Sequence, residues 1–392
     1  MSENRAIGDL IEALIDYRGK TPPKSPSGVP LITAKVIKGG IILPEPREYI
    51  AEEIYDSWMR RGLPSAGDIL ITTEAPLGEV AQVGSDARIA LAQRVILLRP
   101  DCAKVDPQFF FHYLRSPQAR ASLMRRASGT TVSGIRQPEL RAVVVPLLPR
   151  PMQEIVGRIL DVLDGLIKNN GRRVQVLEEI VRTSYREWFV RFRFPGHEDV
   201  PLVDSSVGPI PEGWHALTLG GVIELKYGKA LKADARSGGD VAVVGSSGIV
   251  GWHNDAQVAG PAIVVGRKGN VGSVTWIDGP CWPIDTTYFV ESALPFRFIV
   301  EQLRRTEFLN THAAVPGLSR DLAYSKPFIR PPDRLMIEFA KMSEALASEG
   351  SALERQNQCL AKMRDLLLPK LVTGQIDISR LDLDSLAQGA VA

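Results

Sequence analysis

The sequence predicts an α+β protein built from two similar globular domains and two long helices. Apolar residues recur in alternating steps of three and four in two stretches, 151–195 and 332–369, a spacing typical of helices with a narrow apolar seam. A globular block precedes each stretch, and both blocks share one order of strand-like, turn-like and helix-like segments. The repeat has a period of roughly 185 residues, which is too long for a solenoid.

Residues 1–149 form the first expected domain. Short apolar runs predict strands at Val29–Thr33, Asp68–Thr72, Arg94–Leu98 and Val143–Leu147. Loop signals containing glycine and proline separate these runs, and Pro107–Arg126 predicts a helix. The order shows no βαβ regularity, which favours an α+β domain.

The first long helix is expected over residues 150–194, between Pro151 and the pair Pro195-Gly196. Three glycines, Gly157, Gly165 and Gly171, each cost such a helix about 1 kcal/mol relative to alanine. The helix is therefore expected to need a partner helix. Its predicted seam consists of Val156, Ile159, Leu163, Leu166, Asn170 and Leu177.

Residues 195–213 are rich in proline and poor in apolar residues, and this composition indicates a linker. The second domain, 214–332, repeats the plan of the first, since Gly260–Val265 matches Gly67–Thr72 and Pro295–Leu309 matches the predicted helix at 107–126. Trp188, Phe189 and Trp214 are expected in a core.

The second long helix is expected over 333–375, followed by a tail at 376–392. Its predicted seam consists of Leu346, Leu353, Asn357, Leu360 and Leu367. A polar residue in each seam lowers stability but can fix the register of the pair. Two ordinary amphipathic helices on globular cores remain an alternative. The length favours a paired-helix spacer, because about 39 residues span about 58 Å.

Composition limits the class of protein. The chain is 44% hydrophobic and 23% charged, so it can bury real cores. No apolar run reaches the length that crosses a bilayer. Three isolated cysteines suggest reduced thiols and a cytoplasmic protein, and five scattered histidines suggest no metal site. A net charge of +2 requires any basic surface to be local.

Signatures of catalysis are absent from the sequence. It contains no GxxxxGK[ST], HExxH, CxxC pair or GxSxG motif. We therefore expect no catalytic residues, no cofactor and no enzymatic activity in this chain alone.

Loops in both blocks carry side chains that suit nucleic acid. Arginine and lysine contact phosphates and guanine, asparagine contacts adenine, and serine or threonine contacts either. Solvated turn residues are the alternative for each position. The candidates for DNA contact are Arg18, Lys20, Lys35, Lys38, Thr73, Arg94, Thr130, Thr131, Ser133 and Arg136 in the first block, and Tyr227, Lys229, Ser246, Arg267, Lys268, Asn270, Thr286, Thr287 and Arg320 in the second.

Motifs along nearly the whole chain resemble the DNA-specificity (S) subunits of type I restriction–modification systems. The segments that carry the resemblance are Gly67–Leu70, Gly134–Arg141, Trp188–Phe192, Pro209–Trp214, Gly266–Gly272, Trp282–Thr286, Pro316–Leu318 and Leu366–Gly374. The chain departs from the family where each long helix begins, since the usual Pro-Pro-Leu-x-Glu-Gln is incomplete at Pro149–Glu154 and Pro331–Met336. That departure blurs the expected starts of the helices.

The resemblance implies two target-recognition domains for a bipartite site in double-stranded DNA, held apart by the long helices as an antiparallel coiled coil. It also implies two adenine-N6 methyltransferase subunits as partners, which hold S-adenosylmethionine, and restriction/translocase subunits that use ATP and Mg²⁺. Two alternatives remain: a stand-alone DNA methyltransferase or nuclease, and a coiled-coil scaffold that does not bind DNA.

Overall fold

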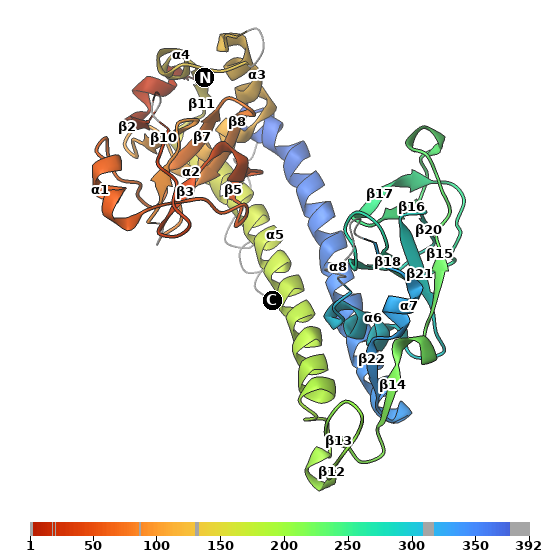
Figure 1. Ribbon diagram of the computed structural model, residues 1–392. Coiled ribbons are helices and arrows are strands. Elements are labelled where there is room, and N and C mark those ends of the chain that lie inside the picture. Colours follow the sequence, from red (N-terminus) through yellow and green to blue (C-terminus); the bar gives the residue numbers. More distant parts are fainter. Residues whose placement is uncertain are drawn as a thin grey trace. The chain divides into compact units, whose positions relative to one another are not determined.

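The computed structural model describes residues 3–17, 19, 21–85, 88–129, 133–308 and 317–376. The chain divides into two compact units, residues 1–170 with 355–392, and residues 171–354. Each unit contains one α+β domain and a part of both long helices (Figure 1).

An antiparallel four-stranded sheet forms the centre of the first domain, in the order β2 (Ile11–Asp16), β10 (Val95–Pro100), β7 (Ile69–Thr73) and β8 (Leu77–Gln82). Both faces of this sheet are buried. Ile69 and Ile71 belong to a core shared with helices, whereas Leu70 belongs to a core on the opposite face. This alternation follows from the two-residue period of a strand.

Smaller elements cover the opposite face and the ends of the sheet. Core residues of the sheet β6–β3–β9 belong to the same cluster as Leu70. The remaining bounds are β1 (Glu3–Ala6), which pairs with β11 (Val144–Leu147), β3 (Val29–Ile32), β4 (Ile37–Lys38), β5 (Ile41–Ile42), β6 (Tyr49–Ile50), β9 (Ala90–Leu91), α1 (Tyr55–Trp58) and α4 (Gln137–Arg141). Strands therefore lie at all four runs that the sequence predicted.

The prediction of one continuous helix over residues 107–126 is wrong. The structure has two helices, α2 (Pro107–Arg115) and α3 (Pro117–Arg126). Ser116 is extended, with φ −71° and ψ 152°, because a residue that precedes proline avoids the helical region. The Ser116 hydroxyl then accepts a hydrogen bond from Ala119 N at 3.1 Å and caps α3.

The second domain repeats the sheet in the order β15 (Glu224–Tyr227), β21 (Thr287–Glu291), β18 (Ala262–Gly266) and β19 (Val274–Ile277). One face packs on helical and aromatic residues, and the other on the sheet β17–β16–β20. Further bounds are β14 (His215–Thr218), paired with β22 (Pro327–Arg330), β16 (Val241–Gly245), β17 (Gly248–His253), β20 (Cys281–Pro283), α6 (Phe296–Arg305) and α7 (Arg320–Tyr324). The helix predicted over 295–309 ends at Arg305.

An aromatic cluster joins the second domain to the end of the first long helix. Phe189 lies 4.8 Å from Phe298 and 5.3 Å from Phe339 between ring centroids. Phe189 and Trp214 are buried, and Trp188 packs against Phe189 and Phe339 of the same cluster, so the prediction that these three belong to a core is confirmed. The proline-rich segment 195–213 includes a short antiparallel pair, β12 (Leu202–Val203) with β13 (Ile210–Pro211).

The long helices are α5 (Arg150–Tyr185) and α8 (Asp333–Val372). The first ends earlier than the expected residue 194, because Arg186–Val190 form a π-helical turn and Phe192 has a φ of 59°, which lies outside the helical region.

Pairing between the long helices is antiparallel. In the first unit, Asp164 bonds to Arg364 at 2.8 Å and Asn170 to Gln356 at 2.9 Å, so rising numbers in α5 meet falling numbers in α8. In the second unit, Arg173 pairs with Glu349 at 2.9 Å. The predicted fold class, two similar α+β domains with two long helices packed as an antiparallel coiled coil, is confirmed.

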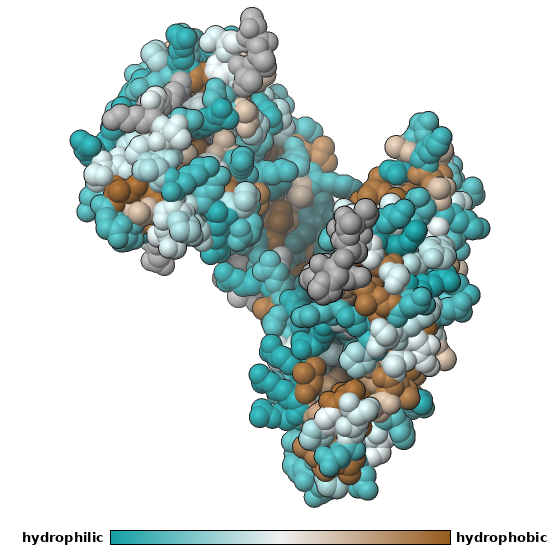
Figure 2. Space-filling model, in the orientation of Figure 1, coloured by the Kyte–Doolittle hydropathy of each residue, from teal (hydrophilic) through white to brown (hydrophobic). Residues whose placement is uncertain are grey.

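Hydrophilic residues cover most of the visible face of each domain, and apolar residues show only in patches (Figure 2). Among the described residues, no helix combines the length and the hydropathy needed to cross a bilayer.

Candidate functional site

The same hydrogen-bonded frame occurs at one end of the main sheet in each domain. In the first domain, Thr73 N donates to Arg94 O at 3.0 Å and Thr73 O accepts from Ile135 N at 3.0 Å. In the second, Arg267 N donates to Thr286 O at 2.9 Å and Arg267 O accepts from Leu318 N at 2.9 Å. Three loops that are distant in sequence therefore meet at equivalent places in the two domains.

The next residue in each frame completes the correspondence. Glu74 bridges to Gly134 in the first domain, and Lys268 bridges to Gly317 in the second. The backbone is thus equivalent, while the side chain it presents changes from a carboxylate to an ammonium. We call the two places the first loop surface (Thr73, Glu74, Gln93, Arg94, Arg136) and the second loop surface (Tyr227, Arg267, Lys268, Thr286, Arg320).

At the second loop surface, two guanidinium groups stack on one tyrosine. The Cζ atoms of Arg267 and Arg320 lie 5.0 Å and 4.2 Å from the ring centroid of Tyr227. They lie 5.9 Å and 6.0 Å from the centroid of the buried Tyr288. Such stacking fixes the plane of a guanidinium and leaves its N–H edge free to donate.

Tyr288 is buried beneath Arg267 and Arg320 and holds this surface in place. Burial raises the pKa of Tyr288 to about 12, and the hydrogen bond with Tyr227 acts in the same direction. The hydroxyl therefore stays protonated at neutral pH, and it donates to Leu318 O at 2.9 Å. This bond holds the loop that precedes Arg320.

The other predicted residues of the second domain lie around these groups in different roles. Lys268 and Lys229 are exposed, and their amides are held by Thr286 O at 3.1 Å and Pro283 O at 3.0 Å. Asn270 N donates to the hydroxyl of Ser246 at 3.4 Å. Thr287 is buried and its hydroxyl donates to Ile284 O at 2.8 Å, so it braces the loop.

At the first loop surface, an ion pair occupies the centre. Arg94 Nε lies 2.7 Å from Glu74 Oε1, and both side chains are partly exposed. A pocket of about 600 Å³ is lined by Gly19, Thr73, Glu74, Gln93, Ser128, Gly129, Gly134, Ile135 and Arg136. The pair presents a donor and an acceptor side by side.

The remaining predicted residues of the first domain separate into three groups. Lys35 and Arg94 line a neighbouring pocket of about 300 Å³. Ser133 and Lys38 are exposed, and neither lines the two pockets just described. Arg18, Lys20, Thr130 and Thr131 lie outside the described residues.

Sequence reasoning missed Gln93, Glu74 and Tyr288 as parts of these surfaces. Gln93 carries a recognisable signal, since an amide next to Arg94 in a turn suits base contacts. The partner of Glu74 and the support under Arg267 depend on contacts between different strands, which the linear sequence does not display.

The helix seam brings its predicted polar residues to partners across the pair. Asn170 is buried and donates to Gln356, whereas Asn357 Nδ2 donates to Ile167 O at 3.1 Å. Val156 and Leu353 are buried, and the rest of the predicted seam is half-buried, namely Ile159, Leu163, Leu166, Leu177, Leu346, Leu360 and Leu367. Buried positions missed by the prediction include Leu160 and Leu368.

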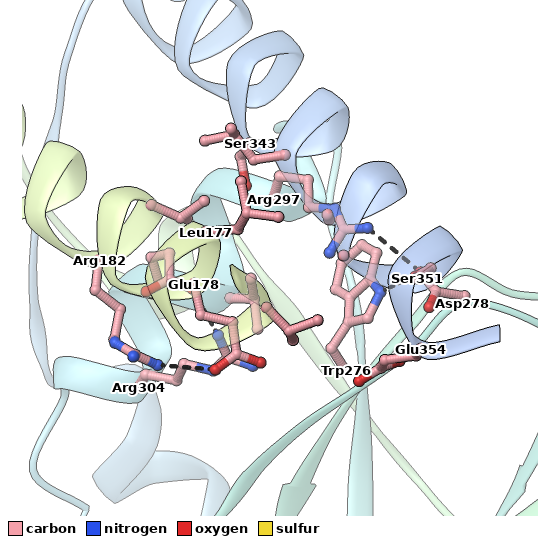
Figure 3. Close-up of a pocket in the computed structure, with 17 residues that line it drawn as sticks. Leu177, Glu178, Arg182, Trp276, Asp278, Arg297, Arg304, Ser343, Ser351 and Glu354 are labelled. Carbon is pink, nitrogen blue, oxygen red and sulfur yellow. Dashed lines mark hydrogen bonds and ion pairs between the residues drawn. The ribbon is translucent and has the colours of Figure 1, made fainter. Parts of the chain in front are cut away.

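A pocket of about 420 Å³ in the second unit offers a different chemistry (Figure 3). It is lined by residues of α5, α6, β19 and α8, and the arginines of its lining are paired with carboxylates. Arg297 lies 2.7 Å from Glu344 and 3.3 Å from Asp278, and Arg304 lies 2.6 Å from Glu301. These arginines have carboxylate partners, whereas Arg267 and Arg320 of the second loop surface have none among the described residues.

Comparison with known proteins adds an independent finding. A family model described as the type I restriction modification DNA specificity domain matches residues 2–179. The type I restriction enzyme MjaIX specificity subunit of Methanocaldococcus jannaschii is 22% identical over 348 residues, which cover 80% of this chain and 79% of that protein. The crystal structure of the type I restriction-modification system S subunit from M. genitalium has a similar fold, with a TM-score of 0.58 and 18% identity over 95% of this chain and 96% of that chain.

Proposed function

We propose that this chain is a DNA-specificity subunit of a type I restriction–modification system, as its similarity to that family supports. Each α+β domain would then contact one part of a bipartite target in double-stranded DNA. The two loop surfaces are the proposed contact sites. The chain itself would recognise DNA and position other subunits.

One observation carries this proposal: equivalent frames present different side chains. The hydrogen bonds of Thr73 and Arg267 place the loops alike, while Glu74 is replaced by Lys268. Two half-sites of unlike sequence require this combination, because base edges differ in their donors and acceptors while the duplex backbone does not.

The proposed partners follow from the family. Two adenine-N6 methyltransferase subunits would hold S-adenosylmethionine, and restriction/translocase subunits would use ATP and Mg²⁺. The long helices α5 and α8 would connect the two recognition domains within that assembly. No step of methylation or cleavage is assigned to residues of this chain.

Co-expression with the methyltransferase subunits, followed by single-molecule sequencing of methylated DNA, tests the proposal. We expect one methylated motif with two specified parts and a spacer of fixed length and unspecified sequence. A contiguous motif would contradict the assignment of one half-site to each domain.

Two further outcomes separate the alternatives. Methylation or cleavage of DNA by the purified chain alone would favour a stand-alone enzyme. Absence of DNA binding even with the methyltransferase subunits present would favour a scaffold.

A further inference from the structure

Arg267 and Arg320 differ from most arginines of the described chain in having no carboxylate partner. Arg297 shows the contrast: its Cζ also stacks on an aromatic ring, 3.9 Å from the centroid of Trp276, but Glu344 and Asp278 neutralise it. Among the described residues, no carboxylate oxygen lies within 4.0 Å of a side-chain nitrogen of Arg267 or Arg320, so neither arginine forms a salt bridge. Within the part of the chain that the structure describes, the two positive groups on Tyr227 thus have no counter-ion.

The donors of these two side chains are only partly used. One Nη of Arg267 donates to Asp285 O at 2.9 Å. The Nε of Arg320 is buried and cannot face a ligand, so the terminal Nη groups are the donors that Arg320 can offer, and no described residue accepts a hydrogen bond from them. A guanidinium carries five N–H donors and no acceptor. The guanidinium planes of Arg267 and Arg320 are therefore fixed while some of their N–H donors are free. A ligand with closely spaced hydrogen-bond acceptors would match this arrangement.

Guanine offers that pattern in the major groove, where its O6 and N7 lie side by side as acceptors, and bidentate arginine is their commonest partner. The equivalent of Glu74 at this surface is Lys268, which adds a donor where the first domain has an acceptor. An acceptor at that position would suit the amino groups of cytosine or adenine instead.

We propose that the domain of residues 214–332 recognises guanine in its half-site, with Arg320 and Arg267 donating to N7 and O6 from the stack on Tyr227. This inference rests on the proposed function, because it names the base that one of the two domains contacts. Arg267 and Arg320 are the specificity-determining residues of this domain.

The first test removes a single acceptor from DNA. The complex with its methyltransferase subunits binds duplexes in which each guanine of the methylated motif is replaced in turn by 7-deazaguanine, which lacks N7. At fixed salt, we expect one or more of these replacements to weaken binding by the wild-type chain about 5- to 150-fold. Insensitivity at every guanine, or a motif without guanine in either half, overturns the inference.

The second test connects that guanine to the arginines. Arg320→Lys keeps the positive charge but loses the bidentate fork, so binding should weaken and the same 7-deazaguanine replacement should cost nothing further. Arg94→Ala, in the other domain, is the matched control and should keep the full sensitivity to the replacement. A thermal unfolding curve for each variant shows that it is folded.

The alternative role for these arginines is contact with phosphate, and the experiment distinguishes it. If Arg320→Lys and Arg267→Ala weaken all sequences equally and leave the 7-deazaguanine effect intact, the residues bind the backbone and the inference is wrong. If the wild-type complex showed no sequence-specific DNA binding, that result would instead contradict the proposed function itself.

Discussion

Gly157 lies where helix α5 passes the start of helix α2. A Cβ at this position would lie 2.9 Å from Asp106 Oδ1 and 3.0 Å from Phe109 N. Asp106 caps α2 by accepting a hydrogen bond from Phe109 N at 2.8 Å. The glycine therefore permits a close contact between two elements, which compensates for its low helix propensity.

We expect Gly157→Ala to lower the free energy of unfolding by about 1–3 kcal/mol, because the added methyl must displace backbone and cap atoms. Gly165→Ala is the matched control in the same helix. No atom lies within 4 Å of its added Cβ, so this change should raise the free energy of unfolding by about 0.5–1 kcal/mol. Urea unfolding measures both, and equal effects of the two variants would refute the argument.

Lys268 tests the electrostatic part of DNA binding. Its side chain is exposed, and contact with a phosphate would contribute through release of counterions. We expect Lys268→Ala to weaken DNA binding by an amount that shrinks as salt concentration rises. Lys226→Ala is the control, since Lys226 is already paired with Glu224 at 2.5 Å on strand β15. A salt-independent loss at Lys268 would argue against phosphate contact.

At the scale of single residues, the sequence named residue types that suit DNA contact, but it could not show which of them lie together. The sequence named Arg267 and Lys268 as neighbouring candidates, and in the structure the backbone N–H groups of both donate to Thr286 O. The pairing of Arg94 with Glu74 and the stacking of Arg320 on Tyr227 join different strands and loops. Those contacts depend on register, which a single sequence leaves open.

Among the elements, Asp164 of helix α5 holds three helices together within the first unit. It accepts hydrogen bonds from Arg115 at the end of α2 and from Arg364 of α8. Burial alone would raise the pKa of Asp164, but the hydrogen bonds and charges of Arg115 and Arg364 outweigh it and hold the pKa below its usual range. The carboxylate is thus more stable in the folded state.

The sign of the pH dependence follows from that shift. A carboxyl with a lowered pKa contributes stability above its unfolded pKa of about 3.9, and the contribution is lost as pH falls through the folded pKa. We expect Asp164→Asn to cost about 2 kcal/mol near pH 7 and progressively less below pH 4. Guanidinium unfolding between pH 2.5 and 7 measures this, with Glu354→Gln as the control at an exposed position of α8. If the difference in the free energy of unfolding between Asp164→Asn and the wild type stays constant with pH, the carboxylate does not have this role.

Helix existence was easier to predict from the sequence than helix ends. The three-and-four spacing identified α5 and α8, because their seams are long and regular. The break between α2 and α3 was missed, although Ser116-Pro117 is a recognisable start signal. The π-helical turn at Arg186–Val190 has no comparable signal, since it occurs where Tyr185 and Phe189 pack into the aromatic cluster.

For the whole molecule, the duplication is the feature that sequence and structure describe in the same terms. The sheet order β2–β10–β7–β8 recurs as β15–β21–β18–β19, with the same cross-loop hydrogen bonds. Each long helix contributes to both units, since the division falls after Asn170 in α5 and after Glu354 in α8. The side chains at the loop surfaces differ between the domains. The repeat therefore preserves the backbone hydrogen bonds that hold the loops but not the side chains that the loops present.

Lengthening both helices at this division tests whether they set the spacing of the target. Four residues inserted after Asn170 and four after Glu354 would add about 6 Å of helical rise to each helix. Along B-DNA that distance corresponds to at most about two base pairs. We expect the spacer of the methylated motif to lengthen by one or two base pairs, while both specified half-sites stay the same, because the loop surfaces are unchanged.

Insertion into α5 alone is the control and should lower stability, since it moves Asn170 and the seam beyond it out of register with α8. Sequencing of methylated DNA decides the result: a normal motif with an unchanged spacer would show that the helices do not fix the separation of the half-sites.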